Sequence, residues 1–217
     1  MEFISRFFAL LFLIVLLPII TLISLLSLIF QGQPVFFKQE RVGYKYKTFN
    51  IYKFRSMEKN SGDLITQAKD SRVTTFGKIL RKTKTDEIPQ IINILKGEMR
   101  FVGPRPEVPE FVERNNFKFL QKIKPGISDF SSIIFRDETK ILKRIGGDNP
   151  YAKLLPIKLQ LADYYSRKKS FLLDLRLVII TIISIIFPEF ASRFFLLPSL
   201  IIDIPSIKGF LNRYLYY

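Results

Sequence analysis

The stretch "TKTDEIPQIINILKGEM", residues 83–99, contains the clearest helix signal in the chain. Its apolar residues follow the i, i+3, i+4, i+7 spacing that places side chains on one buried face: Ile88, Ile91, Ile92 and Leu95. Thr85 stands where a helix N-cap is expected, Pro89 is tolerated in a first turn, and Gly97 suits a helix end. We therefore predict a helix from Asp86 to Lys96.

This helix begins with two adjacent acids, Asp86 and Glu87, in a chain of formal net charge +15. The helical repeat places Asp86 on the polar face with Gln90 and Asn93, and Glu87 at the edge of the apolar face. Glu87 is therefore predicted to be the more desolvated of the two. Acids in a first turn commonly only complement the helix dipole, and for the pair alone this ordinary explanation is the favoured one.

The composition of the 217 residues excludes many reaction types, because the chain contains no cysteine and no histidine. Disulfides, a Cys or His nucleophile or base, a Ser-His-Asp triad and an ordinary zinc site are all excluded. Residues 1–30 carry only Glu2 and Arg6 as charged residues, so the positive excess lies in the middle of the chain. Such a surface suits a polyanion or an anionic membrane face, although a simply solvated basic surface would look the same.

Residues 7–30, "FFALLFLIVLLPIITLISLLSLIF", form an uncharged run. As a helix this run would reach roughly 36 Å, enough to cross a bilayer core of about 30 Å. Pro18 in its middle predicts a kink. The helix either spans with a bend or turns back as a re-entrant hairpin, and physics alone favours spanning, since one proline usually only bends a membrane helix. The basic residues that follow, from Lys38 to Lys47, place the next segment on the cytoplasmic side.

The rest of the chain predicts a mainly α fold with a small β-hairpin (α+β). The hairpin comes from β-rich runs at 34–40 and 48–54 around a turn near Gly43. Residues 58–70 read as a polar loop, and a helix is expected over about 108–123.

Late in the chain, the uncharged run 177–187 is too short to span a membrane and predicts either a core helix or one lying in the interface. Three regions result. They are a membrane segment at 1–32, a cytoplasmic domain at 33–187, and an apolar, aromatic tail at 188–217 that is expected to associate with the membrane.

Several blocks occur in one order: "FFKQERVG", "FNIYKFRSM", "GKILRKTKTDEIPQIINILKGEMRFVGPRP", "KPGIS" and "YYSRKKSFLLDL". Together, over roughly residues 3–187, they resemble the bacterial sugar transferase family, the monotopic phosphoglycosyl transferases. Members transfer a phosphosugar from a nucleotide diphosphate sugar to a polyprenol phosphate, usually undecaprenyl phosphate, and release UMP. The resemblance implies a re-entrant membrane helix broken near Pro18, amphipathic interfacial helices, and a location on the cytoplasmic face of the bacterial inner membrane.

The resemblance also implies the roles of site residues. Asp86 would be the nucleophile that forms a phosphosugar-aspartyl intermediate, Glu87 would assist, and Mg²⁺ would bridge the diphosphate and Asp86. A carboxylate approaching a diphosphate meets strong repulsion, which cations must offset. The substrate-binding candidates that the resemblance provides are Arg81, Arg105, Arg136, Lys53 and Arg55.

The implied partners are a UDP-sugar, undecaprenyl phosphate and membrane lipid but no nucleic acid, with a homodimer left open. The chain departs from the family pattern at Ala9, where an acid is common, at Leu17, where serine often precedes the proline, and in "KPGISDFSSIIFR". Two alternatives are a non-catalytic basic membrane protein that binds anionic lipid or nucleic acid, and a Mg²⁺-dependent phosphohydrolase that uses water as acceptor.

Overall fold

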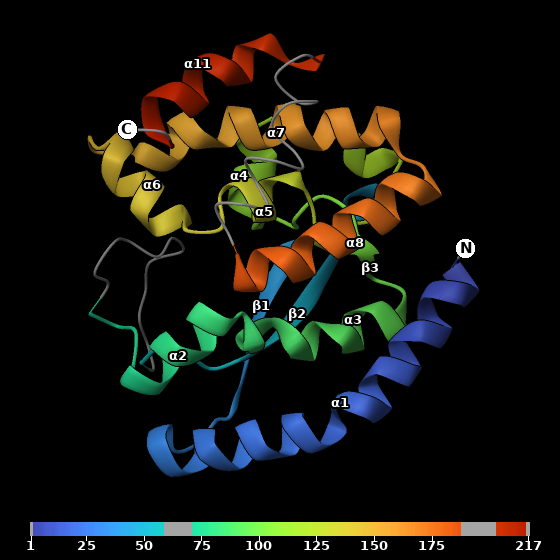
Figure 1. The fold of residues 1–217 in the computed structure, drawn as a ribbon, viewed down its shortest axis with the longest axis vertical. Coiled ribbons are helices and arrows are strands. Elements are labelled where there is room, and N and C mark those ends of the chain that lie inside the picture. The colour runs from blue at the N-terminus through green and yellow to red at the C-terminus, as the bar shows by residue number, and fades with distance from the viewer. Residues whose placement is uncertain (1, 59–70, 188–202, 216–217) are drawn as a thin grey trace.

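The structure, a computed structural model, describes residues 2–58, 71–187 and 203–215. Most of the predicted polar loop at 58–70, and residues 188–202 of the tail, lie outside the described residues. Helices dominate the fold, and the predicted α+β class is confirmed (Figure 1).

The α-helices of the described residues are α1 Glu2–Gln31, α2 Thr75–Thr83, α3 Ile91–Lys96, α4 Pro109–Arg114, α5 Phe130–Ile134, α6 Glu138–Ile145, α7 Pro150–Lys168, α8 Phe171–Ile186 and α11 Pro205–Tyr214. The 3₁₀ helices are η1 Tyr44–Tyr46, η2 Thr85–Gln90 and η3 Lys118–Gln121. The strands are β1 Phe36–Val42, β2 Thr48–Phe54, β3 Arg100–Val102 and β4 Gly126–Ser128.

Two small sheets form. Strands β1 and β2 pair antiparallel from Phe36 opposite Phe54 to Val42 opposite Thr48, which confirms the predicted hairpin. Strands β3 and β4 pair in parallel, and at three residues each they are too short to leave a periodic signal. Their close approach depends on Gly126, because a side chain there would collide with the backbone nitrogen of Gly103.

The stretch 83–99 folds differently in detail from its prediction. It begins as the 3₁₀ helix η2 and continues as α3, so the single helix from Asp86 is wrong in type over its first turn. The residue that caps η2 is Lys84, in the left-handed conformation with φ 58° and ψ 15°, and not Thr85. The end at Gly97 is as expected, with φ 77°. The expected helix over 108–123 is also broken, because Asn115 is extended between α4 and η3.

Helix α3 is covered on both sides, by α1 below it and by the hairpin behind it (Figure 1). Ile94 and Met99 pack against Ala9 of α1 in one apolar cluster. The predicted polar face is therefore also buried, with Gln90 at 2 % and Asn93 at 0 % exposure.

The buried side chain of Asn93 forms hydrogen bonds with protein groups in place of water. Its side-chain nitrogen donates to the Asn50 carbonyl and to Glu98, each at 2.7 Å, and its oxygen accepts from the Tyr52 backbone nitrogen at 3.2 Å. A buried amide that is satisfied in this way fixes α3 against β2.

Helix α1 runs unbroken through Pro18 and bends between its two halves, as the proline predicts (Figure 1). The hydroxyl of Thr21 donates to the Leu17 carbonyl at 2.9 Å, and that of Ser24 to the Ile20 carbonyl at 2.7 Å. Bonds from a side-chain hydroxyl to a carbonyl one turn earlier bend helices. Hydroxyl groups are thus present just after Pro18, although Leu17 before it has none. By length and composition, α1 is long and apolar enough to cross a membrane.

Both ends of α1 contact the same domain. At the start, Glu2 forms an ion pair with Lys124 at 2.7 Å, and the Arg6 guanidinium lies directly against Gly97. At the end, Arg55 donates to the carbonyls of Gln31, Gly32 and Gln33, the last at 3.0 Å. Between these ends, the described residues leave the apolar outer face of α1 exposed.

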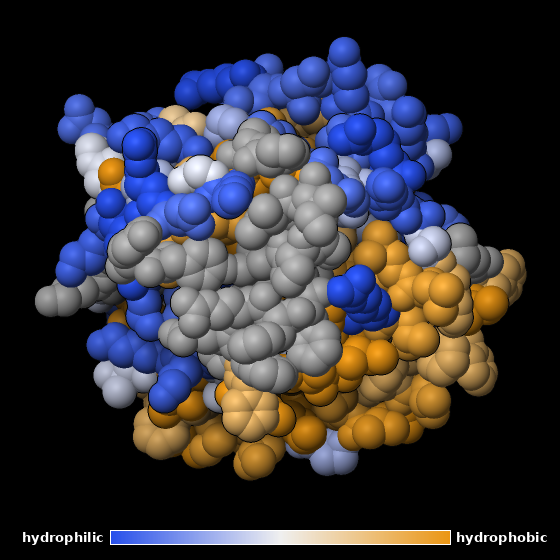
Figure 2. Space-filling model, turned by 45° about the horizontal axis from the view of Figure 1, so that its top comes forward, coloured by the Kyte–Doolittle hydropathy of each residue, from blue (hydrophilic) through white to orange (hydrophobic). Residues whose placement is uncertain are grey.

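The second large apolar surface belongs to α8, which buries Leu177, Ile180 and Ser184 and exposes Ile179, Ile182 and Ile186 on its other face. It is thus both a core helix and an exposed apolar one. Figure 2 shows hydrophobic side chains gathered on the lower part of the molecule and hydrophilic ones above them.

Helix α11, the described part of the tail, buries Ile207 and Leu211 against the core and lies at the end of the molecule opposite α1 (Figure 1). Its C-terminal carbonyls accept from Arg144 of α6, at 3.1 Å from Tyr214. The residues of α11 lie far from the apolar surface of α1 (Figure 1). They give no support to the predicted membrane association of the tail, which stays a prediction.

We predict that Asn93→Ala lowers the free energy of unfolding by about 2–4 kcal/mol, because it strands the Asn50 carbonyl and the Tyr52 amide in the interior. Thermal unfolding in detergent would measure this. The matched control is Asn116→Ala at an exposed position, which should leave Tm unchanged. Equal Tm values for the two variants would contradict a structural role for Asn93.

Candidate active site

Asp86 is nearly covered, with 7 % of its surface exposed, at the start of η2. Among the residues that the structure describes, no donor reaches its Oδ1. Burial raises the pKa of its carboxyl, the neighbouring Glu87 raises it further, and the charges of Lys53, Lys84 and Arg81 oppose the rise. Asp86 therefore presents a carboxylate oxygen that is poorly stabilised by the protein itself.

Glu87 has the opposite environment. Arg105 donates from two nitrogens, to Oε2 at 3.1 Å and to Oε1 at 2.5 Å, and Lys53 donates to Oε1 at 3.0 Å. Burial by itself would raise the pKa of this carboxyl, but Arg105 and Lys53 outweigh it and hold the pKa well below the usual range. The predicted contrast in desolvation is wrong, because Asp86 is buried and Glu87, with 12 % of its side chain exposed, is nearly so. What separates the two acids is their partners.

Arg105 and Lys53 reach Glu87 from two different elements, the "GPRP" loop after β3 and strand β2. Glu87 in turn raises the pKa of Arg105, so this guanidinium stays charged. A bidentate arginine–carboxylate pair of this kind is among the stronger side-chain contacts in proteins. It fixes the side chain of Glu87, and no equivalent partner for Asp86 lies within the part of the chain that the structure describes.

The "GPRP" loop is itself held by a buried ionic network around Glu107. Tyr151 donates to Oε1 at 2.6 Å and Lys158 at 3.0 Å, while Arg41 reaches Oε2 at 3.4 Å. Burial would raise the pKa of Glu107, but Lys158 and then Arg41 lower it overall. Because Glu107 lies two residues after Arg105, the network fixes the loop that presents Arg105 to Glu87.

Sequence reasoning missed this network. Its partners are far apart in the chain, with Glu107 in a loop and Lys158 in α7. One signal was available, because Lys158 falls four residues after Leu154 and three before Leu161, on the apolar face of its helix. A charge inside an apolar stripe indicates a buried partner.

Three further basic residues belong to the region of the acid pair, and their contacts differ. Arg81 is in the last turn of α2, and its charge acts on Asp86. Arg136 donates to the Lys82 carbonyl at 3.2 Å and leaves its Nη1 buried without a partner among the described residues. Lys84, which sequence reasoning did not single out, is half-buried next to both acids, and burial lowers the pKa of its ammonium group.

Arg55 is not part of this group. Its Nη1 and Nη2 donate to the carbonyls at the end of α1, and the Gln31 side chain donates to the backbone carbonyl of Arg55 at 3.1 Å. A buried arginine at a helix C-terminus complements the helix dipole and the free carbonyls there. Substrate binding by Arg55 therefore stays a prediction, and the contacts give it a structural role.

A divalent cation would find few protein ligands here. The described residues hold no cluster of three or more acidic, histidine or cysteine side chains. Glu87 is occupied by Arg105 and Lys53, which leaves Asp86 with its unpartnered Oδ1. Magnesium commonly binds through one or two carboxylates plus substrate phosphates, so the site suits Mg²⁺ that arrives with a diphosphate.

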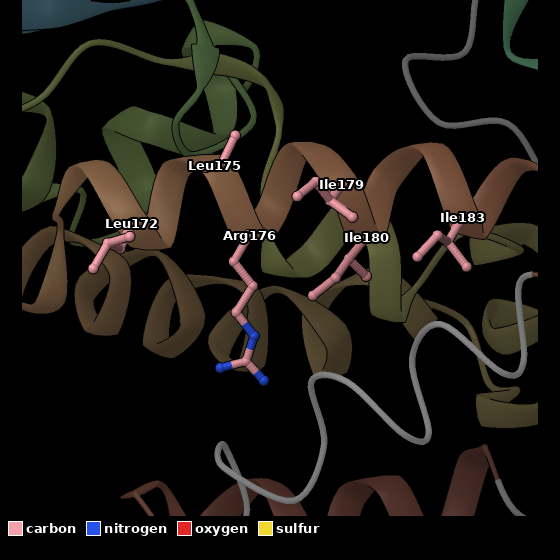
Figure 3. A pocket seen from close by; sticks show the side chains of 6 residues that line it. All are labelled: Leu172, Leu175, Arg176, Ile179, Ile180 and Ile183. Atoms are coloured by element: carbon pink, nitrogen blue, oxygen red, sulfur yellow. The ribbon is translucent and has the colours of Figure 1, made fainter.

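A separate hollow of about 260 Å³ lies on the exposed face of α8. Figure 3 shows that its lining is aliphatic apart from Arg176, whose side chain extends away from the helix. No residue of the acid pair or its cations lines it, so the hollow offers apolar contact but no group for acid–base or phosphoryl chemistry.

Comparison with known proteins provides an independent line of evidence. The family model described as bacterial sugar transferase matches residues 2–188. A UDP-N-acetylgalactosamine-undecaprenyl-phosphate N-acetylgalactosaminephosphotransferase of Aeromonas hydrophila is 36 % identical over 166 residues, which cover 70 % of this chain and 36 % of that protein.

Two further relatives differ in length. A UDP-glucose:undecaprenyl-phosphate glucose-1-phosphate transferase of Xanthomonas campestris pv. campestris is 34 % identical over 163 residues, 70 % of this chain and 32 % of that protein. An uncharacterized sugar transferase of Bacillus subtilis (strain 168), EpsL, is 34 % identical over 163 residues, 73 % of each chain. The chain thus spans about a third of the length of the two larger relatives.

We predict that Lys158→Met lowers the free energy of unfolding by about 3–5 kcal/mol, because it leaves the charge of Glu107 buried without its nearest cation. Thermal unfolding would measure the loss. The double variant Lys158→Met with Glu107→Gln should recover part of it, since the uncompensated charge is gone.

The same network predicts acid sensitivity. Because the folded-state pKa of Glu107 lies below the ordinary 4.5, its contribution is present above that pH and is lost as the pH falls through the folded-state pKa. Glu107→Gln should remove this part of the pH dependence.

A Lys158→Met variant with wild-type Tm would contradict the buried pairing.

Proposed function

The chain belongs to the bacterial sugar transferase family, and we propose that it transfers a sugar 1-phosphate from a UDP-sugar to undecaprenyl phosphate. The relatives with this activity in their names use different sugars, so the proposal is restricted to the class of donor. The products would be an undecaprenyl diphosphosugar and UMP. This would be the first membrane step of surface glycan synthesis.

The observation that carries the proposal is the asymmetry of the acid pair. Glu87 is neutralised by Arg105 and Lys53, whereas Asp86 has an unpartnered oxygen and a raised pKa. An ionised carboxylate that the protein stabilises poorly is the better nucleophile of the two. A purely structural acid pair at a helix start would need neither the burial of Asp86 nor the contacts of Arg105 and Lys53 with Glu87.

The proposed reaction has two displacements. First, an Asp86 carboxylate oxygen attacks the phosphorus that carries the sugar, the bond from this phosphorus to the bridging oxygen breaks, and UMP leaves with that oxygen. An acyl phosphate results. Second, a phosphate oxygen of undecaprenyl phosphate attacks the same phosphorus, the acyl–phosphate bond breaks, and Asp86 is regenerated.

The protein's task in both steps is to hold anionic phosphate next to an anionic carboxylate. The charge of Arg81 in α2 acts on Asp86, and Arg136, which contacts the Lys82 carbonyl from the segment before α6, acts on Lys84. Both arginines would offset part of this repulsion when the diphosphate is bound. Mg²⁺ would be held by Asp86 together with the diphosphate, and its charge would stabilise the leaving phosphate. Glu87 would assist by fixing Arg105 in place.

The membrane arrangement that we propose is a re-entrant α1 at the cytoplasmic face of the bacterial inner membrane. Two observations support it: Glu2 and Arg6 at the start of α1, and Gln31 at its end, all contact the same domain. A spanning helix would place its two ends on opposite sides of a bilayer core of about 30 Å, where a single domain could not contact both of them. A re-entrant helix keeps the active site at headgroup depth, where the phosphate of a polyprenol lies.

Asp86→Asn is predicted to abolish UMP release from a UDP-sugar in the presence of undecaprenyl phosphate and Mg²⁺, because an amide cannot serve as this nucleophile. Glu87→Gln should reduce release severely. Without the acceptor, intact-mass spectrometry should find one phosphosugar added to a peptide containing Asp86. Full activity of Asp86→Asn would overturn the assignment.

The same assay separates transfer from hydrolysis. A transferase should release about one UMP per active site without undecaprenyl phosphate, while a phosphohydrolase would continue to turn over. A panel of UDP-sugars would then identify the donor. Absence of UMP release with every donor, together with retained lipid or nucleic-acid binding, would favour the non-catalytic alternative.

For the topology, we predict that residue 3 and residue 33 are both shielded from reagents outside the cell. The chain is cysteine-free, so Phe3→Cys and Gln33→Cys report without background, and both positions are exposed in the fold. Phe3 is preferred to Glu2 because Glu2 pairs with Lys124. Labelling of position 3 in intact cells by a membrane-impermeant thiol reagent would show a spanning helix and refute the re-entrant form.

A further inference from the structure

Lys84 has an unusual backbone conformation at the junction of α2 and η2. Only three non-glycine residues of the described chain have positive φ, and two of them, Lys45 and Tyr46, are in the turn of the β1–β2 hairpin. The third is Lys84, with φ 58° and ψ 15°, at a helix C-cap where glycine or asparagine is the usual residue. A lysine there strains the backbone, and such strain gathers at functional sites.

The conformation places a cation beside the acid pair. The backbone nitrogen of Lys84 closes α2 by donating to the carbonyls of Arg81 and Leu80, so α2 ends at Thr83, three residues before Asp86. The side chain is half-buried, and its charge acts on Asp86 and on Glu87, while the charges of Arg105 and Arg136 act on it. The ammonium group thus belongs to the same cluster of charges as the acid pair.

The other cations near Glu87 have partners. Lys53 and Arg105 are bound to Glu87, and Arg136, whose charge acts on Lys84, donates through Nη2 to the Lys82 carbonyl. For the Lys84 ammonium, in contrast, no hydrogen bond or ion pair is formed with any residue that the structure describes. A half-buried ammonium without an anionic partner is costly unless a ligand supplies the anion.

We propose that Lys84 is a further catalytic residue, whose ammonium group binds the donor's diphosphate at the phosphoryl group that Asp86 attacks. The proposal rests on the proposed function for its substrate class. It explains both features of Lys84, because a glycine would relieve the strain but would provide no cation. It also separates two roles: Arg105 and Lys53 neutralise Glu87, and Lys84 neutralises the substrate.

The test measures binding without turnover, using inorganic pyrophosphate and UDP with the full-length detergent-solubilised chain in the presence of MgCl₂. Calorimetry should show Lys84→Gln binding both ligands about tenfold to a hundredfold more weakly than wild type, the usual effect of losing a charge-assisted hydrogen bond. Lys82→Gln is the matched control, because it removes the same charge from an exposed neighbour, and its affinity should equal that of wild type. Lys84→Arg, which keeps the charge, should restore most of the affinity.

Lys84→Gly separates binding from folding. It removes the cation but relieves the positive φ, so its Tm should be no lower than that of wild type while pyrophosphate affinity falls as in Lys84→Gln. Unchanged pyrophosphate affinity in Lys84→Gln, or an equal loss in Lys82→Gln, would overturn the proposal. The binding assay does not require transfer. If the wild-type chain bound pyrophosphate but released no UMP, the proposed function would be overturned and the proposal for Lys84 would still be testable.

Discussion

Two adjacent buried carboxylates cannot both stay charged in a protein interior without help, and the clamp of Arg105 and Lys53 on Glu87 resolves this conflict. The clamp draws one residue from a loop and one from a strand onto one side chain. Glu87 thereby becomes a fixed, neutralised anchor, whereas no donor among the described residues reaches Oδ1 of Asp86, the residue that we propose as the nucleophile. The chemistry that we propose for the site follows from this unequal distribution of cations rather than from the acids alone.

The clamp depends in turn on parts of the fold that carry no reactive group. The Glu107 network with Lys158 and Tyr151 ties the "GPRP" loop to α7, and Asn93 ties α3 to the hairpin that carries Lys53. Each tie is a buried polar contact between segments that are far apart in sequence. Loss of either should therefore disturb Glu87 as well as lower stability, because the two clamping cations would lose their fixed positions.

How much the sequence could predict differs between local and tertiary features. The hairpin, the end of α3 at Gly97 and the bend of α1 at Pro18 depend on neighbouring residues, and the sequence indicated each of them. The left-handed Lys84, the burial of Asn93 and the contact of Arg55 with the end of α1 depend on packing partners. Residue spacing along one helix gives the direction of a side chain but not what covers it, which is why Asp86 could be placed on a polar face and still be buried.

The same limits explain the membrane helix. Physics applied to residues 7–30 alone favours a kinked spanning helix, because nothing within the run requires it to turn back. The contacts that favour the re-entrant form lie outside the run: Lys124 and Gly97 hold the start of α1, and Arg55 holds its end. Since Gly97 also ends α3 and Arg55 directly follows β2, the elements that fix α1 are those that fix the acid pair. In the proposed arrangement, one group of contacts would therefore set both the depth of α1 in the membrane and the position of Asp86, as the proposed reaction between a soluble donor and a lipid phosphate requires.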